Sequence, residues 1–132
     1  MTASAAGLYG FRDHPTYCAS KFGCVGLIRT LSLDTSLKNE KITFNAVCPA
    51  MVETGMGSAA YYKYVKENML HLLTPMSTVM NAFNRILSGD STGEILECSG
   101  ERMEARPEIE RLDNTLEELT SMFDIFLKMF GP

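Results

Sequence analysis

The sequence lacks several patterns that would identify common classes of protein. Its four cysteines form no CxxC pair, and its two histidines have no metal-ligand spacing to them, so neither a zinc site nor a redox dithiol is predicted. No apolar run approaches the ~20 residues that span a bilayer, and neither a signal peptide nor the hydrolase pattern GxSxG is present. We therefore expect a cytoplasmic protein with buried, reduced cysteines.

The charge distribution separates the end of the chain from the rest. Residues 1–100 carry eight basic and eight acidic side chains, whereas residues 101–132 carry four basic and eight acidic ones. The whole net charge of −4 therefore lies in this acidic tail. Because there is no basic patch, neither nucleic acid nor an anionic membrane surface is an expected partner.

Helical and strand patterns alternate in front of the tail. Pro15 suits the first turn of a helix, and apolar residues at helical spacing extend this helix to about residues 37–39. Two glycines inside it, Gly23 and Gly26, are predicted to mark the close approach of another backbone. The other predicted elements are strands at 41–47 and 94–99 and helices at 59–73 and about 75–87.

This alternation predicts an α/β domain with parallel strand pairing. A parallel sheet buries both faces and needs more strands than the two predicted here, so we interpret residues 1–100 as part of a larger doubly wound sheet. Thr74 and Pro75 suit the N-cap and the first position of the helix before the last strand.

The acidic tail, residues 101–132, has a heptad-like apolar pattern. Its apolar residues recur at alternating spacings of three and four, and the opposite face is acidic. We expect an amphipathic helix that packs on its own domain or on a partner helix. A membrane surface is disfavoured because the polar face is acidic. The apolar seam consists of Ile109, Leu112, Leu116, Leu119, Phe123, Phe126 and Phe130.

Two tyrosine–lysine pairs have a spacing of four residues, Tyr17–Lys21 and Tyr62–Lys66. On a helix such a pair shares one face, and an ammonium beside a phenol favours the phenolate, which makes tyrosine a usable acid and base. About 0.2 such pairs are expected by chance, so the spacing alone is weak evidence. Small residues separate the members of the first pair, whereas bulky ones separate those of the second.

A third group favours the first pair. Ser4 precedes Tyr17 by thirteen residues and lies in a small-residue turn, where its hydroxyl could polarise a carbonyl oxygen. The residue thirteen before Tyr62 is Pro49, which has no such group. Tyr17 and Lys21 are therefore the candidate proton-transfer pair.

Three motifs in this order resemble the C-terminal half of the short-chain dehydrogenase/reductase family. The family has a serine at the end of a strand, YxASK on the next helix, and NxVxPGxVxT after the following strand. Here SAAG stands at 4–7, YCASK at 17–21 and NAVCPAMVET at 45–54, with Ala50 where the family usually has glycine. The resemblance covers roughly residues 1–100 and implies the C-terminal portion of a Rossmann-like, doubly wound parallel sheet.

The resemblance also implies a function: an NAD- or NADP-dependent oxidoreductase that interconverts a secondary alcohol and a ketone. Tyr17 would be the catalytic acid and base, Lys21 would promote its ionisation and bind the nicotinamide ribose, and Ser4 would hold the substrate oxygen. A small-molecule alcohol or ketone is the implied partner, and the family's use of the tyrosine helix in subunit contacts implies a homo-oligomer. The residues lining the nicotinamide would be Pro49, Val52 and Thr54, and residues 56–73 would be the substrate loop.

The cofactor-binding half of the family has no counterpart in this sequence. The TGxxxGxG turn that holds the pyrophosphate, the residue that selects the adenosine ribose and the family's catalytic Asn are absent. We therefore expect a fragment that binds NAD(P) poorly by itself. The alternative hypothesis is a truncated, inactive remnant that acts at most as a protein-interaction module, through the helix of Tyr17 and the acidic tail.

Overall fold

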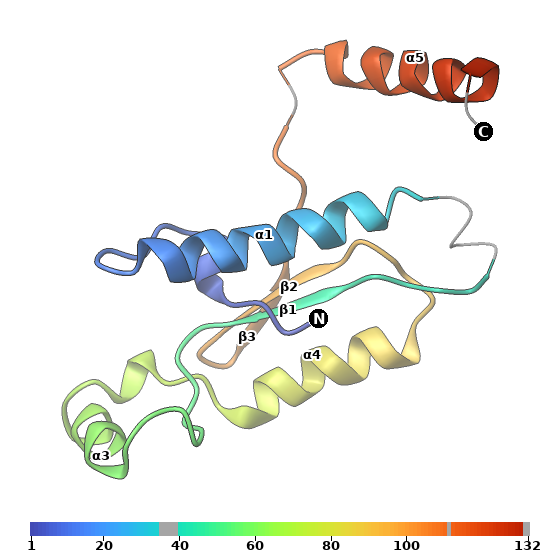
Figure 1. Cartoon of the computed structure of the whole chain (residues 1–132). Helices are drawn as coiled ribbons and strands as arrows, with labels where there is room; N and C mark the ends of the chain where they lie inside the picture. Colours follow the sequence, from blue (N-terminus) through green and yellow to red (C-terminus); the bar gives the residue numbers. More distant parts are fainter. Residues whose placement is uncertain (35–39, 111, 131–132) are drawn as a thin grey trace.

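The computed structural model describes residues 1–34, 40–110 and 112–130, in which helices cover both faces of a short sheet (Figure 1). The helices are α1 (Pro15–Leu31), α3 (Ala59–Asn68), α4 (Met76–Ser88) and α5 (Thr115–Phe130). Two short 3-10 helices are η1 (Ala5–Gly7) and η2 (Leu70–Leu72). The strands are β1 (Ala46–Pro49), β2 (Ile95–Ser99) and β3 (Arg102–Ala105).

The sheet is mixed and has the strand order β1-β2-β3. β1 and β2 run parallel, with Ala46 opposite Ile95, which confirms the predicted parallel pairing. β2 and β3 form an antiparallel hairpin that the sequence pattern did not predict. On the other side of β1, Thr2 pairs with Val47 in a parallel bridge. Three neighbouring parallel segments therefore make up the part of the sheet that the α/β prediction anticipated.

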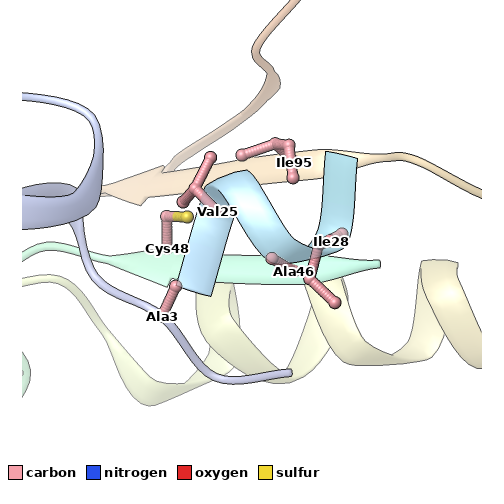
Figure 2. Close-up of a cluster of buried hydrophobic side chains, with 6 residues drawn as sticks. All are labelled: Ala3, Val25, Ile28, Ala46, Cys48 and Ile95. Carbon is pink, nitrogen blue, oxygen red and sulfur yellow. The ribbon is translucent and has the colours of Figure 1, made fainter. Parts of the chain in front are cut away.

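Two apolar layers hold the helices to the sheet. α1 lies on one face and α4 on the other (Figure 1). Alternate residues of each strand point to opposite faces, so neighbouring residues of β2 serve different layers. Figure 2 shows the α1 layer, in which Val25 and Ile28 of the helix meet residues of the sheet. The sheet residues of that layer are Ala3, Ala46, Cys48 and Ile95, and the α4 layer contains Val47, Val79, Ala82, Leu96 and Cys98.

The cysteines are free thiols that mostly belong to these layers. Cys18, Cys48 and Cys98 are buried, as predicted, and Cys24 is half-buried. Burial raises the pKa of the Cys48 thiol to about 11. This thiol is therefore neutral near neutral pH and acts as a packing group rather than a nucleophile.

Three predicted element boundaries were wrong. α1 ends at Leu31, where the hydroxyl of Ser32 turns back to donate to the carbonyl of Arg29; residues 35–39 lie outside the described residues. The strand predicted from residue 41 begins at Ala46, and Lys41 itself has a positive φ of 58°, outside the extended region. The helix predicted over 59–73 ends at Asn68, and η2 follows it.

Thr74 does not cap α4. Its hydroxyl accepts a hydrogen bond from the backbone N–H of Gly100 at 3.1 Å, so it connects the segment before α4 to the turn after β2. Pro75 is the cap residue instead, and the helix begins one residue later than predicted, at Met76.

The glycines of α1 do not mark a close backbone approach within the described residues. A Cβ atom built on Gly23 or on Gly26 would meet nothing within 4 Å. Both glycines lie on the exposed side of the helix, away from the sheet. The close approach occurs at another glycine, Gly7, and belongs to the site described below.

Part of the tail forms a helix, α5, which stands apart from the sheet and its covering helices (Figure 1). The predicted seam is helical only from Leu116 onward, because α5 begins at Thr115 and leaves Ile109 and Leu112 outside it. The seam residues are exposed, from 50% at Leu119 to 101% at Leu112. The Arg29 guanidinium donates a hydrogen bond to the carbonyl of Pro107 at 3.0 Å, which connects the segment before α5 to α1. None of the helices described here has the length and apolar character needed to cross a membrane.

We predict that Ile28→Ala destabilises the fold much more than Leu27→Ala. Ile28 is 3% exposed and belongs to the α1 layer, whereas its neighbour Leu27 is 49% exposed. The expected losses in the free energy of unfolding are about 2–5 kcal/mol for the buried residue and below about 1 kcal/mol for the exposed one. Urea unfolding followed by circular dichroism measures both, and equal losses would contradict the described packing of α1.

Candidate active site

α1 carries the candidate proton-transfer pair on one face. Pro15 starts the helix, so Tyr17 and Lys21 lie one turn apart near its N-terminal end. The Lys21 ammonium lies 5.6 Å from the centroid of the Tyr17 ring. It also donates a long hydrogen bond of 3.5 Å to the carbonyl of Thr2. The pair is therefore assembled beside the parallel segment that precedes Ser4.

Ser4 lies at the end of that segment, where the chain leaves the sheet. The N–H of Ala3 donates to the carbonyl of Val47 at 2.8 Å, which fixes the segment on β1. Ser4 is then the N-cap of η1, and its Oγ accepts from the N–H of Ala6 at 3.1 Å. The same hydroxyl donates to the carbonyl of Pro49 at 3.5 Å.

Gly7 allows η1 to pack directly on α1. A Cβ atom at this position would lie 2.6 Å from the carbonyl oxygen of Lys21 and 2.8 Å from its carbonyl carbon. Contacts this short with backbone atoms cannot be relieved by turning a side chain. Glycine is therefore required here, and its absence of a side chain sets the distance between η1 and the helix of Tyr17.

Ser4 and Tyr17 line the same cavity, which has a volume of about 380 Å³. It lies where the parallel segments end, which is the usual ligand position in open α/β sheets. The Tyr17 side chain is 40% exposed. Within the described residues its hydroxyl makes no hydrogen bond, so it is accessible to a ligand. The lining consists of Ser4, Ala5, Ala6, Tyr9, Gly10, Phe11, Tyr17, Ala50 and Met51.

The residues predicted to line a nicotinamide are close in sequence but lie in different surroundings. Pro49 ends β1 and accepts the Ser4 hydroxyl through its carbonyl. Val52 lines a second cavity of about 480 Å³, next to the first residues of α4. The Thr54 hydroxyl accepts from the N–H of Met56 at 3.3 Å. None of these three lines the cavity of Ser4 and Tyr17.

The second tyrosine–lysine pair has structural roles. Tyr62 is buried, and its hydroxyl donates to the carbonyl of Val52 at 3.0 Å. Lys66 forms an ion pair with Glu53 at 2.7 Å. Both side chains thus attach α3 to the segment after β1, which agrees with the choice of Tyr17 and Lys21 as the candidate pair.

A polar cluster next to the cavity was missed by the sequence analysis. The Tyr9 hydroxyl donates to a carboxylate oxygen of Glu97 at 2.9 Å. Glu97 lies on β2, is 8% exposed, and forms an ion pair with the Arg106 guanidinium. Arg106 lies 3.7 Å from Glu104 of β3 as well. No local sequence signal relates Tyr9 to a strand 88 positions away.

The described residues include groups that suit the nicotinamide end of a nicotinamide nucleotide, but no turn that suits its pyrophosphate. Lys21 has an exposed ammonium with a single weak backbone partner, so it can bind a ribose hydroxyl. Tyr17 and Ser4 present hydroxyls to the cavity. No glycine-rich pyrophosphate turn follows a strand among the described residues. Among the same residues, no three His, Cys, Asp or Glu side chains converge as metal ligands.

Comparison with known families identifies the chain. Residues 1–65 match the family model described as short chain dehydrogenase, and this segment contains η1, α1, β1 and all the site residues predicted above. Residues 1–65, about half of the chain, are thus a segment of the short-chain dehydrogenase/reductase family.

Curated relatives agree with this assignment. The chain is 43% identical over 54 residues to 15-hydroxyprostaglandin dehydrogenase (NAD(+)) of Homo sapiens, covering 41% of this chain and 20% of that protein. It is 36% identical over 87 residues to short-chain dehydrogenase/reductase family 16C member 6 of Bos taurus, covering 65% of this chain and 26% of that one. The chain thus spans about a quarter or less of the length of these relatives.

Solved structures support the fold class. Actinorhodin polyketide ketoreductase with NADPH is similar with a TM-score of 0.60 and 27% identity, over 76% of this chain and 45% of that one. A 4-hydroxyisoleucine dehydrogenase complexed with NADH and succinate matches in fold, with a TM-score of 0.59 and 21% identity over 75% of this chain and 42% of that one. The α/β, Rossmann-like class predicted from the sequence is therefore confirmed.

We predict that Gly7→Ala disturbs the site whereas Gly10→Ala does not. The new methyl group at position 7 would overlap the backbone of Lys21, but at position 10 it would meet nothing within 4 Å. The expected loss in the free energy of unfolding is about 1–3 kcal/mol for Gly7→Ala and within about 0.5 kcal/mol for Gly10→Ala. Amide NMR shifts of Ser4 and Tyr17 should move in the first variant alone; unchanged shifts there would refute the close packing.

We also predict a raised pKa for the Tyr9 phenol. Its hydrogen bond to Glu97 raises this pKa above the ordinary value of 10.0, and partial burial and the negative charge of Glu97 add to the effect. A phenol with a raised pKa in the folded state stabilises the fold below pH 10, and this contribution is lost as pH rises through the folded value. Titration of the ¹³Cζ signal should show the pKa falling toward 10 in Glu97→Gln, and identical midpoints would contradict the hydrogen bond.

Proposed function

We propose that the chain provides the catalytic part of an NAD(P)-dependent oxidoreductase that interconverts a secondary alcohol and a ketone. The observation that carries the proposal is the cavity that Ser4 and Tyr17 share, with the Lys21 ammonium 5.6 Å from the Tyr17 ring. Its volume of about 380 Å³ is within the range of small-molecule sites. The family membership and the oxidoreductase names of the relatives support the same reaction.

Each of the three side chains has a role that its surroundings suit. In ketone reduction Tyr17 donates a proton to the substrate oxygen, and in alcohol oxidation its phenolate accepts that proton. The Lys21 ammonium lies over the Tyr17 ring, 5.6 Å from its centroid, and can stabilise the negative charge that develops as the proton is transferred. Ser4 donates a hydrogen bond to the same substrate oxygen, which orients the reacting carbon.

The cofactor in this proposal is NAD or NADP, which when bound supplies or accepts the hydride. Lys21 would bind the nicotinamide ribose, and the segment Pro49 to Thr54 would line the nicotinamide. A homo-oligomer through the exposed side of α1 is part of the same proposal, because Phe22 and Leu27 are about half exposed there.

The acidic tail supports a second, separate role. We propose that α5, in the tail beyond β3, is an interaction helix rather than a part of the catalytic unit. The exposed apolar seam of α5 is the specific observation that favours this role, since an amphipathic helix gains stability mainly by burying such a face.

We predict that Tyr17→Phe and Lys21→Met abolish turnover while leaving the fold intact. The measurement is NADH- or NADPH-dependent reduction of a panel of ketones by the purified chain, followed at 340 nm. Loss of the proton donor should reduce the rate by about 10²–10⁴-fold. Lys41→Met is the matched control for Lys21→Met, because Lys41 is exposed and lies outside both the cavity and the substrate loop.

Two outcomes would decide against the proposal. Equal rates in wild type, Tyr17→Phe and Lys21→Met would remove these residues from the mechanism. An absence of both turnover and NADH or NADPH binding in the wild-type chain would favour the alternative of an inactive interaction module. Isothermal titration with each cofactor distinguishes a failure of binding from a failure of catalysis.

A further inference from the structure

The cavity of Ser4 and Tyr17 has a lining without charged side chains. Its larger members are the rings of Tyr9, Phe11 and Tyr17 and the thioether of Met51, and the rest are small residues. A carboxylate, phosphate or ammonium group placed inside would find no opposite charge among the described lining residues. Burying such a group without a partner is strongly unfavourable.

Tyr9 offers the cavity its ring rather than its hydroxyl. The hydroxyl is engaged by Glu97 at 2.9 Å, while the side chain as a whole is 49% exposed and belongs to the cavity lining. Glu97 is itself held, because it is 8% exposed and paired with Arg106. The ring is therefore held by its backbone in the loop after η1 and by its hydroxyl, which is bonded to Glu97 of the sheet.

The charge behind Tyr9 also acts on the cavity. Arg106 contacts two carboxylates, those of Glu97 and Glu104, so this cluster carries one net negative charge. The hydrogen bond to Glu97 raises the pKa of the Tyr9 phenol, in agreement with a hydroxyl that stays a donor to that carboxylate. The Lys21 ammonium lies over the Tyr17 ring but is not among the lining residues. An anionic ligand placed against Tyr9 would therefore face the negative charge of the cluster without a cation in the lining, whereas a neutral ligand would contact only the apolar wall.

We infer that this site takes an uncharged alcohol or ketone with an apolar body, and that Tyr9 is the residue that determines this specificity. Glu97 is a positioning residue that acts through Tyr9. The inference rests on the proposed function in one respect, because it takes the reacting oxygen of the ligand to lie between Ser4 and Tyr17. Its test needs no cofactor and no turnover, so its failure can be distinguished from a failure of the proposed reaction.

The experiment compares two ketones of the same chain length, 2-nonanone and 8-oxononanoate, which differ in a terminal carboxylate. Amide and side-chain NMR shifts of the full-length chain are followed during titration with each. We expect 2-nonanone to shift the signals of Tyr9, Phe11 and Met51, and 8-oxononanoate to bind at least about tenfold more weakly, since one unpaired charge must be accommodated.

Three variants test the role of Tyr9. Tyr9→Ala should weaken 2-nonanone binding about tenfold, because it removes an aromatic surface from the lining. Tyr9→Phe keeps the ring but releases it from Glu97, so a loss of about threefold is expected. Glu97→Gln keeps an acceptor for the Tyr9 hydroxyl and removes the negative charge. It should therefore reduce the difference in affinity between 2-nonanone and 8-oxononanoate. Met80→Ala is the control for a half-exposed apolar side chain outside both the cavity and the substrate loop, and it should leave both affinities unchanged.

Equal binding of the two ketones would overturn the inference, as would a preference that Tyr9→Ala and Glu97→Gln leave unchanged. An absence of cavity shifts with 2-nonanone would overturn it too. If Tyr9→Ala proves unfolded, Tyr9→Phe and Glu97→Gln give the same decision, because neither removes volume from the wall. If 2-nonanone binds more tightly than 8-oxononanoate but the NADH assay shows no turnover, the specificity is established and only the proposed reaction is refuted.

Discussion

The packing of Gly7 on the carbonyl of Lys21 is the contact on which the candidate site depends. Ser4 is the N-cap of η1, which ends at Gly7, and α1 carries Tyr17, so the distance between these elements sets the distance between Ser4 and Tyr17. A side chain at position 7 would separate them. The pairing of Ala3 with Val47 then fixes the same unit on the sheet. The site is thus supported by a strand and a helix rather than by a free loop.

Much of the fold could be predicted because its signals are local. The helical spacing after Pro15 and the short strands before Pro49 and Gly100 lie within single segments of sequence, and their alternation predicts parallel pairing. Ser4 and Tyr17 could be related through three motifs in a family-like order, and the structure brings both to one cavity. The boundaries were less predictable: α1 stops at Leu31 through a side-chain bond from Ser32 that competes with the helix.

The features that could not be predicted depend on distant contacts. β3 has exposed and half-buried residues without an apolar alternation, and it forms because Gly100, with a φ of +57°, turns the chain back onto β2. The Tyr9–Glu97–Arg106 cluster connects the loop before α1 to this hairpin. The glycines of α1 suggested a close approach by their position in a helix, whereas the close approach occurs at Gly7, outside any long helix.

The position of β3 determines at which edge of the sheet a further strand could pair. β3 occupies the hydrogen-bonding edge of β2 and presents Arg102 and Glu104 to solvent, and charged side chains on an outer strand discourage pairing with a further strand. At the opposite edge, Thr2 pairs with Val47 on one side, and no described strand pairs with it on the other. Any additional strand, whatever chain supplies it, would therefore join beside Thr2, immediately next to Lys21 and the cavity.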